Sequence, residues 1–236
     1  MQTHEPTPKP VSPRIWLSVS IVYLTFPAIL IGLGGDLGWW QAWFYSVIIF
    51  LAGVGGRVLA ERAHPGLTEE RLNPDHEGNV KAWDKILSPL MALTIAHPTA
   101  VVAGLDHARG WSEPFPLWVN ALGGLLCAVG FYYGVWAFVQ NPFFSSMVRI
   151  QTDRLHRVIE TGPYGLVRHP GYAGNALALV GMVLLLGSSW AALASTLGLA
   201  VCFLRTALED DALMEELPGY RVYAARVRWR LIPFVW

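Results

Sequence analysis

Four long apolar stretches constrain the fold of this chain more than any other feature. A transmembrane helix needs about 20 consecutive, mostly apolar residues to cross the hydrocarbon layer of a bilayer. Four stretches reach this length with almost no charge, at residues 15–35, 40–60, 86–105 and 117–139. The sequence therefore predicts four membrane-spanning helices.

The composition agrees with a protein surrounded by lipid. Only 14% of the residues are charged and the mean hydropathy is +0.39, whereas soluble domains carry about 25% charged residues. The net charge is zero, so nothing indicates a nucleic-acid partner. Cys127 and Cys202 both lie in apolar stretches. We interpret them as packing residues, and we expect neither a disulfide framework nor a metal site.

A fifth apolar stretch, at residues 172–204, is interrupted by Gly187-Ser188-Ser189-Trp190. This pattern predicts two helices joined by a tight turn, a helical hairpin. Either both arms cross the membrane or the pair is partly re-entrant, and the sequence leaves both alternatives open. In the fourth span, Gly130 and Gly134 have a spacing that lets two helices approach closely.

The basic residues predict the orientation of the chain. If the spans alternate in direction, 16 of the 17 Lys and Arg residues lie on one side of the membrane, and Arg109 alone lies on the other. Basic loops remain in the cytoplasm. We therefore expect both termini on the cytoplasmic side, and a multi-pass protein of the bacterial inner membrane. The excess of Arg over Lys, 14 to 3, suggests a bacterial source.

Polar residues are concentrated on both sides of the hairpin. Residues 149–174 hold four Arg, two His and two Tyr, and Arg205 and Glu209 follow the hairpin on one helix face. Because a hairpin returns its ends to one place, Arg168-His169-Pro170 should be a neighbour of the pair Arg205 and Glu209. This predicts a pocket at the cytoplasmic end of the bundle that holds a charged cofactor and opens toward lipid. The alternative is a polar membrane boundary with a surface salt bridge.

Six short motifs in order resemble the superfamily of isoprenylcysteine carboxyl methyltransferases and phospholipid methyltransferases, which are integral membrane enzymes. The resemblance covers the chain from about residue 141 to its end, and Asp210 stands where that family often has Glu. The motifs are His156-Arg157-Val158-Ile159, Gly162-Pro163-Tyr164, Arg168-His169-Pro170-Gly171-Tyr172-Ala173-Gly174, Arg205 with Glu209-Asp210, Tyr220-Arg221-Val222-Tyr223, and Pro233.

The apolar stretches and the charge pattern together predict an all-α bundle of four spans plus the C-terminal hairpin, with a cofactor pocket at the cytoplasmic face. We expect residues 1–14 to be a flexible tail, 15–139 to shape a lipid-facing entrance, and 140–236 to form the catalytic region. The resemblance implies catalytic roles for Arg205, which would face the substrate, and for His169. The residues implied to bind S-adenosylmethionine are His156, Arg157, Val158, Ile159, Tyr164, His169, Pro170, Gly171, Tyr172 and Glu209.

The implied reaction methylates a lipophilic acceptor and releases S-adenosylhomocysteine. The carboxylate of an isoprenylcysteine-like compound is the first expectation, and it needs no general base because it is already ionised. A phospholipid amine or a thiol would need a base, for which His169 and Glu209 are the candidates. We expect no protein partner.

Two other classes of function remain open at the level of the sequence. Sterol and steroid reductases that use NADPH share a related Arg-His-Pro-x-Tyr-x-Gly tail. They typically place Asn before the Tyr and Glu after the Gly, where this chain has Gly171 and Asn175. A non-catalytic scaffold or transporter is disfavoured because the spans hold almost no ionisable residues.

Overall fold

The computed structural model describes residues 11–72 and 79–236, and within these ranges its regular secondary structure is helical throughout. Of the predicted flexible tail, residues 1–14, the first ten lie outside the described part. The main helices are α1 (Pro13–Gly34), α2 (Trp40–Phe50), α3 (Gly56–Ala63), α4 (Leu67–Leu72), α5 (Asp84–Thr94), α6 (His97–Arg109), α7 (Leu117–Gln140), α8 (Pro170–Leu186), α9 (Ser189–Glu216) and α10 (Tyr220–Arg226). A π-helical turn, Leu51–Gly55, joins α2 to α3.

Among the described residues, five helical segments are long and apolar enough to cross a membrane. The four predicted spans are confirmed as α1, Trp40–Ala63, Asp84–Arg109 and α7, and the fifth segment is α9. The third span was expected to be continuous, but it breaks into α5 and α6 at Ile95 and Ala96.

The predicted hairpin is also present, as α8 and α9. Its turn lies at Gly187, whose positive φ of 68° ends α8, and the Ser188 side chain caps α9 by accepting a hydrogen bond from the Ala191 N–H. Helix α9 is long enough to span, whereas the 17 residues of α8 cover only about 25 Å. By length, therefore, only the second arm reaches across a hydrocarbon layer of about 30 Å.

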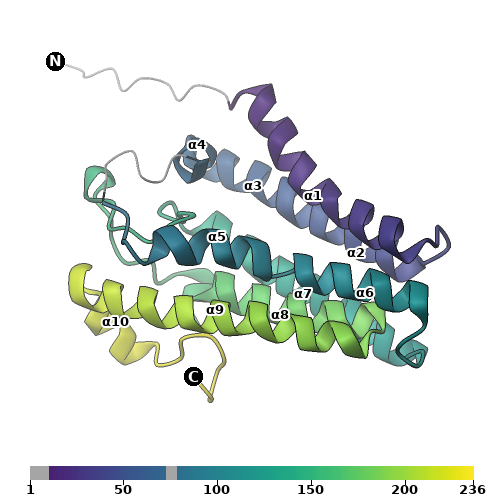
Figure 1. Ribbon diagram of the computed structural model, residues 1–236. Helices are drawn as coiled ribbons and strands as arrows, with labels where there is room; N and C mark the ends of the chain where they lie inside the picture. Colours follow the sequence, from purple (N-terminus) through teal and green to yellow (C-terminus); the bar gives the residue numbers. More distant parts are fainter. Residues whose placement is uncertain (1–10, 73–78) are drawn as a thin grey trace.

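Figure 1 shows how the helices are arranged. The connections α1–α2, α6–α7 and α8–α9 lie at one end of the bundle. Helix α4, the segment between α7 and α8, and α10 lie at the other end, together with the start of α1 and the C-terminus. The motif-bearing segments of the chain therefore meet at a single end, which we call the polar end.

Helices α7 and α8 approach each other closely. A Cβ atom on Gly130 would lie 2.6 Å from the Gly174 carbonyl oxygen, and one on Gly174 would lie 2.7 Å from the Gly134 nitrogen. Real side chains do not tolerate such distances, so this contact requires glycine. The close approach predicted from Gly130 and Gly134 is confirmed, and it positions the start of α8 against α7.

Candidate functional site

A cavity of about 500 Å³ extends from the polar end of the bundle into its apolar middle. This volume lies in the range usual for sites of small molecules and cofactors. The first half of the chain contributes apolar and aromatic walls, among them Tyr23, Phe26 and Ile49. Every site residue expected from the sequence also lines it, namely His156, Arg157, Val158, Ile159, Tyr164, His169, Pro170, Gly171, Tyr172, Arg205 and Glu209.

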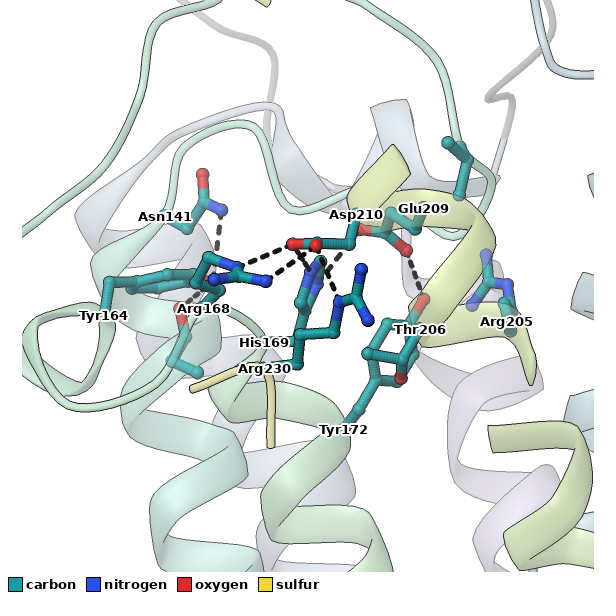
Figure 2. Close-up of polar contacts among 12 residues, drawn as sticks. Asn141, Tyr164, Arg168, His169, Tyr172, Arg205, Thr206, Glu209, Asp210 and Arg230 are labelled. Carbon is teal, nitrogen blue, oxygen red and sulfur yellow. Dashed lines mark hydrogen bonds and ion pairs between the residues drawn. The ribbon is translucent and has the colours of Figure 1, made fainter. Parts of the chain in front are cut away.

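Asp210 is the centre of a buried polar cluster beside this cavity (Figure 2). Its carboxylate accepts two hydrogen bonds of 2.7 Å from Arg168 and one of 2.8 Å from Arg230. The Tyr220 hydroxyl donates at 2.9 Å, and His169 Nε2 lies 3.0 Å away. Asp210 thus fixes the Arg168-His169 segment to α9 and to the C-terminal tail.

Glu209 points to the cavity from the same turn of α9. Its carboxylate accepts a hydrogen bond from the Tyr172 hydroxyl, and its Oε1 atom lies 3.9 Å from His169 Nδ1. Because an ionised carboxylate only accepts hydrogen bonds, His169 donates through Nε2 to Asp210. When the His169 ring is neutral, its Nδ1 atom then carries no proton, and the lone pair of that atom faces Glu209. The two neighbouring acids therefore have different roles. Asp210 holds segments of the chain together, whereas the carboxylate of Glu209 faces the cavity.

Arg205 lies at the cavity wall but is already paired. Its Nε and Nη2 atoms donate to Asp84 at 2.7 and 2.8 Å, and Nη2 also donates to the Ser146 carbonyl at 2.8 Å. The guanidinium lies 5.5 Å from the centre of the Tyr172 ring. Among the described residues, the Nη1 donors of Arg205 have only the Met91 sulfur as a partner, at 3.9 Å. Sequence reasoning found Arg205 but missed Asp84, whose signal was an acidic residue two positions before the predicted span 86–105.

His156 is held as a neutral ring. Its Nδ1 accepts the Gln151 backbone N–H at 3.3 Å, and the ring lies 4.6 Å from that of Phe143. Burial, followed by the charges of Arg149 and Arg154, lowers the pKa of His156 to about 4. At neutral pH the proton is therefore on Nε2, which is left to donate.

Tyr164 presents its ring to the cavity, because its hydroxyl group is already engaged. The hydroxyl accepts from Asn141 at 3.1 Å and donates to the Ala137 carbonyl at 3.4 Å, while Tyr223 donates to the Tyr164 carbonyl at 2.7 Å. Burial raises the pKa of both tyrosines, so both stay protonated.

Two further arginines, missed as site residues, line the cavity from the first half of the chain. Arg57 donates to the Tyr23 hydroxyl. Arg71 donates to the Phe144 carbonyl at 3.1 Å, and burial lowers its pKa to about 9, which leaves it charged at neutral pH. In the sequence Arg57 stands near the end of an apolar stretch, and Arg71 stands in the polar segment that follows it. They make this region of the cavity suitable for an anionic group.

Among the comparisons with known proteins, a family model and two curated relatives name methyltransferases. The family model of the phospholipid methyltransferases matches residues 118–219. Two curated rice proteins, from Oryza sativa subsp. indica and subsp. japonica, are each named "Probable protein-S-isoprenylcysteine O-methyltransferase". Each is 26% identical over 199 residues, which cover 83% of this chain and 97% of the rice protein. The "Cobalt-zinc-cadmium resistance protein CzcN" of Cupriavidus metallidurans is 29% identical over 174 residues, or 68% of this chain and 72% of that protein.

Proposed function

We propose that this chain, which these matches assign to the superfamily of isoprenylcysteine carboxyl methyltransferases and phospholipid methyltransferases, transfers the methyl group of S-adenosylmethionine to a lipophilic acceptor. The matches support a multi-pass membrane methyltransferase. The proposal of S-adenosylmethionine and a lipophilic acceptor rests on one observation, a single cavity that could hold both. Its polar end is lined by His156, His169 and Glu209, and its other end by apolar residues of the membrane spans. One chamber can thus admit a charged soluble compound and a lipid.

The donors and acceptors at the polar end suit this cofactor. S-Adenosylmethionine has a carboxylate, an ammonium and a sulfonium, and when bound it supplies an electrophilic methyl group. The Glu209 carboxylate suits a positive group or a ribose hydroxyl. The Nε2–H of His156 and the backbone N–H groups in the first turn of α8, at Gly171 and Tyr172, suit the carboxylate.

We propose that the other segments that resemble the family make the remaining contacts with the cofactor. Residues 157–159 line the cavity next to His156, and Pro170 begins α8 with a ring that needs no hydrogen-bond partner. The rings of Tyr164 and Tyr172 provide flat surfaces for an adenine or a sulfonium.

The acceptor that we propose is a carboxylate of an isoprenylcysteine-like compound. Such a carboxylate is ionised at neutral pH, so the protein needs to align it with the methyl group and exclude water. Arg205 is held by Asp84 and keeps its Nη1 donors for this group. If the acceptor is an amine or a thiol, the free Nδ1 of His169, or else Glu209, would take its proton.

The active site would face the cytoplasm of a bacterial cell. Support comes from the polar end itself, where predicted cytoplasmic basic residues such as Arg71, Arg157 and Arg168 line the cavity. S-Adenosylmethionine is a soluble, charged compound, so a site at that end could be filled from the aqueous side while the acceptor enters from lipid.

Methyl transfer into membrane lipid tests the proposal. Purified protein is incubated with S-adenosylmethionine labelled in its methyl group and with an extract of bacterial membranes, and label in the organic phase is counted. We expect label that depends on active protein and is lost in Glu209→Gln. Alkali distinguishes the acceptors, because it releases a methyl ester as methanol and leaves N-methyl and S-methyl groups in place. Label that never enters the organic phase would argue against a lipophilic acceptor.

A further inference from the structure

Two arginines from the first half of the chain line the cavity without an acidic partner. Arg57 lies in α3 and Arg71 in α4, and among the described residues no carboxylate bonds to either side chain. Three other arginines of the cavity wall, Arg149, Arg168 and Arg205, each bond to an aspartate or a glutamate. A cation that is partly removed from water is unfavourable unless it is paired. This region of the cavity is therefore prepared for an anion from outside the chain.

The contacts of Arg71 leave one edge of its guanidinium unused. Its Nη1 atom donates to the Phe144 carbonyl at 3.1 Å, and the group lies 4.9 Å from the centre of the Phe138 ring and 5.1 Å from that of Phe144. The Nε and Nη2 atoms have no hydrogen-bond partner among the described residues, and neither atom is fully buried. This edge carries two parallel N–H groups, the arrangement that fits the two oxygens of a carboxylate.

Arg205 cannot offer the same edge to a ligand. Its Nε and Nη2 atoms are occupied by Asp84, which leaves only the Nη1 donors for the acceptor. Ser146 connects the two arginines, because its carbonyl accepts from Arg205 Nη2 at 2.8 Å and its hydroxyl donates to the Arg71 backbone carbonyl at 2.7 Å. A carboxylate that contacts Arg205 therefore has a second arginine in the same wall of the cavity.

Arg57 brings another unpaired charge to this wall. Helix α3 packs against α7, where a Cβ atom on Gly56 would lie 2.8 Å from Cγ2 of Val135, and Arg71 lies over Phe138, three residues further along α7. The two arginines thus lie beside adjacent turns of α7. Burial, followed by the charge of Arg57, lowers the pKa of Arg71 to about 9. The two cations repel each other, and an anion bound next to them relieves that repulsion.

We propose that Arg71, supported by the charge of Arg57, binds the acceptor carboxylate together with Arg205. This inference rests on the proposed function, because it adds residues to the site of that acceptor. It also explains how substrate and product are distinguished. Methyl transfer converts the carboxylate to a neutral ester and the sulfonium to a thioether, so the product loses the charge-assisted hydrogen bonds that hold the substrate. The first half of the chain thereby selects an acid over its ester.

An acid and its methyl ester test the inference by equilibrium binding to the detergent-purified protein. The probes are N-acetyl-S-farnesyl-cysteine and its methyl ester. We expect the acid to bind about tenfold more tightly than the ester. Arg71→Gln should reduce this preference to about twofold, by weakening the acid and not the ester, and Arg57→Gln should reduce it to about fourfold. Arg62→Gln is the matched control, because it removes the same charge from an exposed residue of α3 outside the cavity, and it should keep the full preference.

Each outcome supports or overturns the inference. A wild-type protein that binds neither probe, or both equally, overturns it, and so does a preference that survives Arg71→Gln. An equal loss of affinity for both probes in Arg71→Gln also overturns it. If this variant does not fold, Arg71→Lys decides, since lysine keeps the charge but lacks the edge with two nitrogens and should still lose most of the preference.

The affinity for S-adenosylhomocysteine is measured in the same samples and separates this inference from the proposed function. Intact affinity without a preference that depends on Arg71 refutes only the inference. Absent affinity in the wild type counts against the proposed function.

Discussion

The carboxylate of Asp84 holds the guanidinium of Arg205 in two parallel hydrogen bonds of 2.7 and 2.8 Å. The Asp84 side chain is fully buried and that of Arg205 is 7% exposed, although the two residues lie 121 positions apart. Asp84 also accepts the Val148 backbone N–H at 2.6 Å. A residue of the first half of the chain therefore orients the arginine that belongs to the C-terminal motifs.

This pairing predicts a specific defect in Asp84→Asn. The amide cannot provide two acceptors to Arg205, and a buried charge that loses its partner destabilises a protein by about 3–5 kcal/mol. We expect a lower melting temperature and a raised KM for the acceptor, with the affinity for S-adenosylmethionine retained. Steady-state kinetics at saturating cofactor, together with thermal unfolding, measure both effects.

The control is Asp106→Asn at the opposite end of the bundle. Asp106 is also buried, but it accepts hydrogen bonds from Ser112 at 2.8 and 2.6 Å and does not line the cavity. We expect this variant to lose stability without a change in KM. An unchanged KM in Asp84→Asn would refute the positioning role.

Substitutions of two adjacent aspartates, Asp210 and Asp211, should change the free energy of unfolding by very different amounts. Asp210 is buried between Arg168 and Arg230, whereas the side chain of Asp211 is 64% exposed and lies 3.4 Å from Arg230. We expect Asp210→Asn to lower the free energy of unfolding by about 3–5 kcal/mol and Asp211→Asn to change it by less than about 1 kcal/mol. Denaturant titration in detergent compares them, and equal effects would contradict the central place given to Asp210.

The contact between α7 and α8 predicts that Gly174→Ala destabilises the bundle. A Cβ atom there would lie 2.5 Å from the Gly130 carbonyl oxygen, so the helices must move apart, and such overpacking costs about 1–3 kcal/mol. Gly32→Ala is the matched control, since nothing lies within 4 Å of its Cβ position. We expect unchanged or higher thermal stability in the control. A Gly174→Ala protein as stable as the control would show that the contact is loose.

The lowered pKa of His156 predicts that the protein becomes less stable as the pH falls. Its pKa is about 4 in the folded protein, against about 6.5 in the unfolded chain. The unfolded chain therefore binds the proton first, so the contribution of His156 is complete above about pH 6.5 and is lost between about pH 6.5 and 4. Melting temperatures over this range should fall less steeply in His156→Phe than in the wild type. Identical slopes would mean that folding does not lower the pKa of His156.

The sequence predicted the spans and the hairpin because their length and apolar character are local properties. It also predicted that His169 and Glu209 would meet, since a hairpin returns its ends to one place. It could not reveal that Asp84 pairs with Arg205, because that contact depends on how α5 packs against α9. For the same reason Arg71, Tyr45 and His97 were not recognised as cavity residues. These side chains come to line one cavity only when the spans pack together.

The most direct test of the central claim is calorimetric binding of S-adenosylhomocysteine to the detergent-purified protein, with NADPH as the parallel ligand. We predict micromolar affinity for S-adenosylhomocysteine, weakened in Glu209→Gln and lost in His169→Ala, and no binding of NADPH. Arg205→Ala should retain this affinity, because we assign Arg205 to the acceptor. Binding of NADPH alone would contradict the account and indicate a membrane reductase, and the roles proposed for Arg205 and Glu209 would then be wrong.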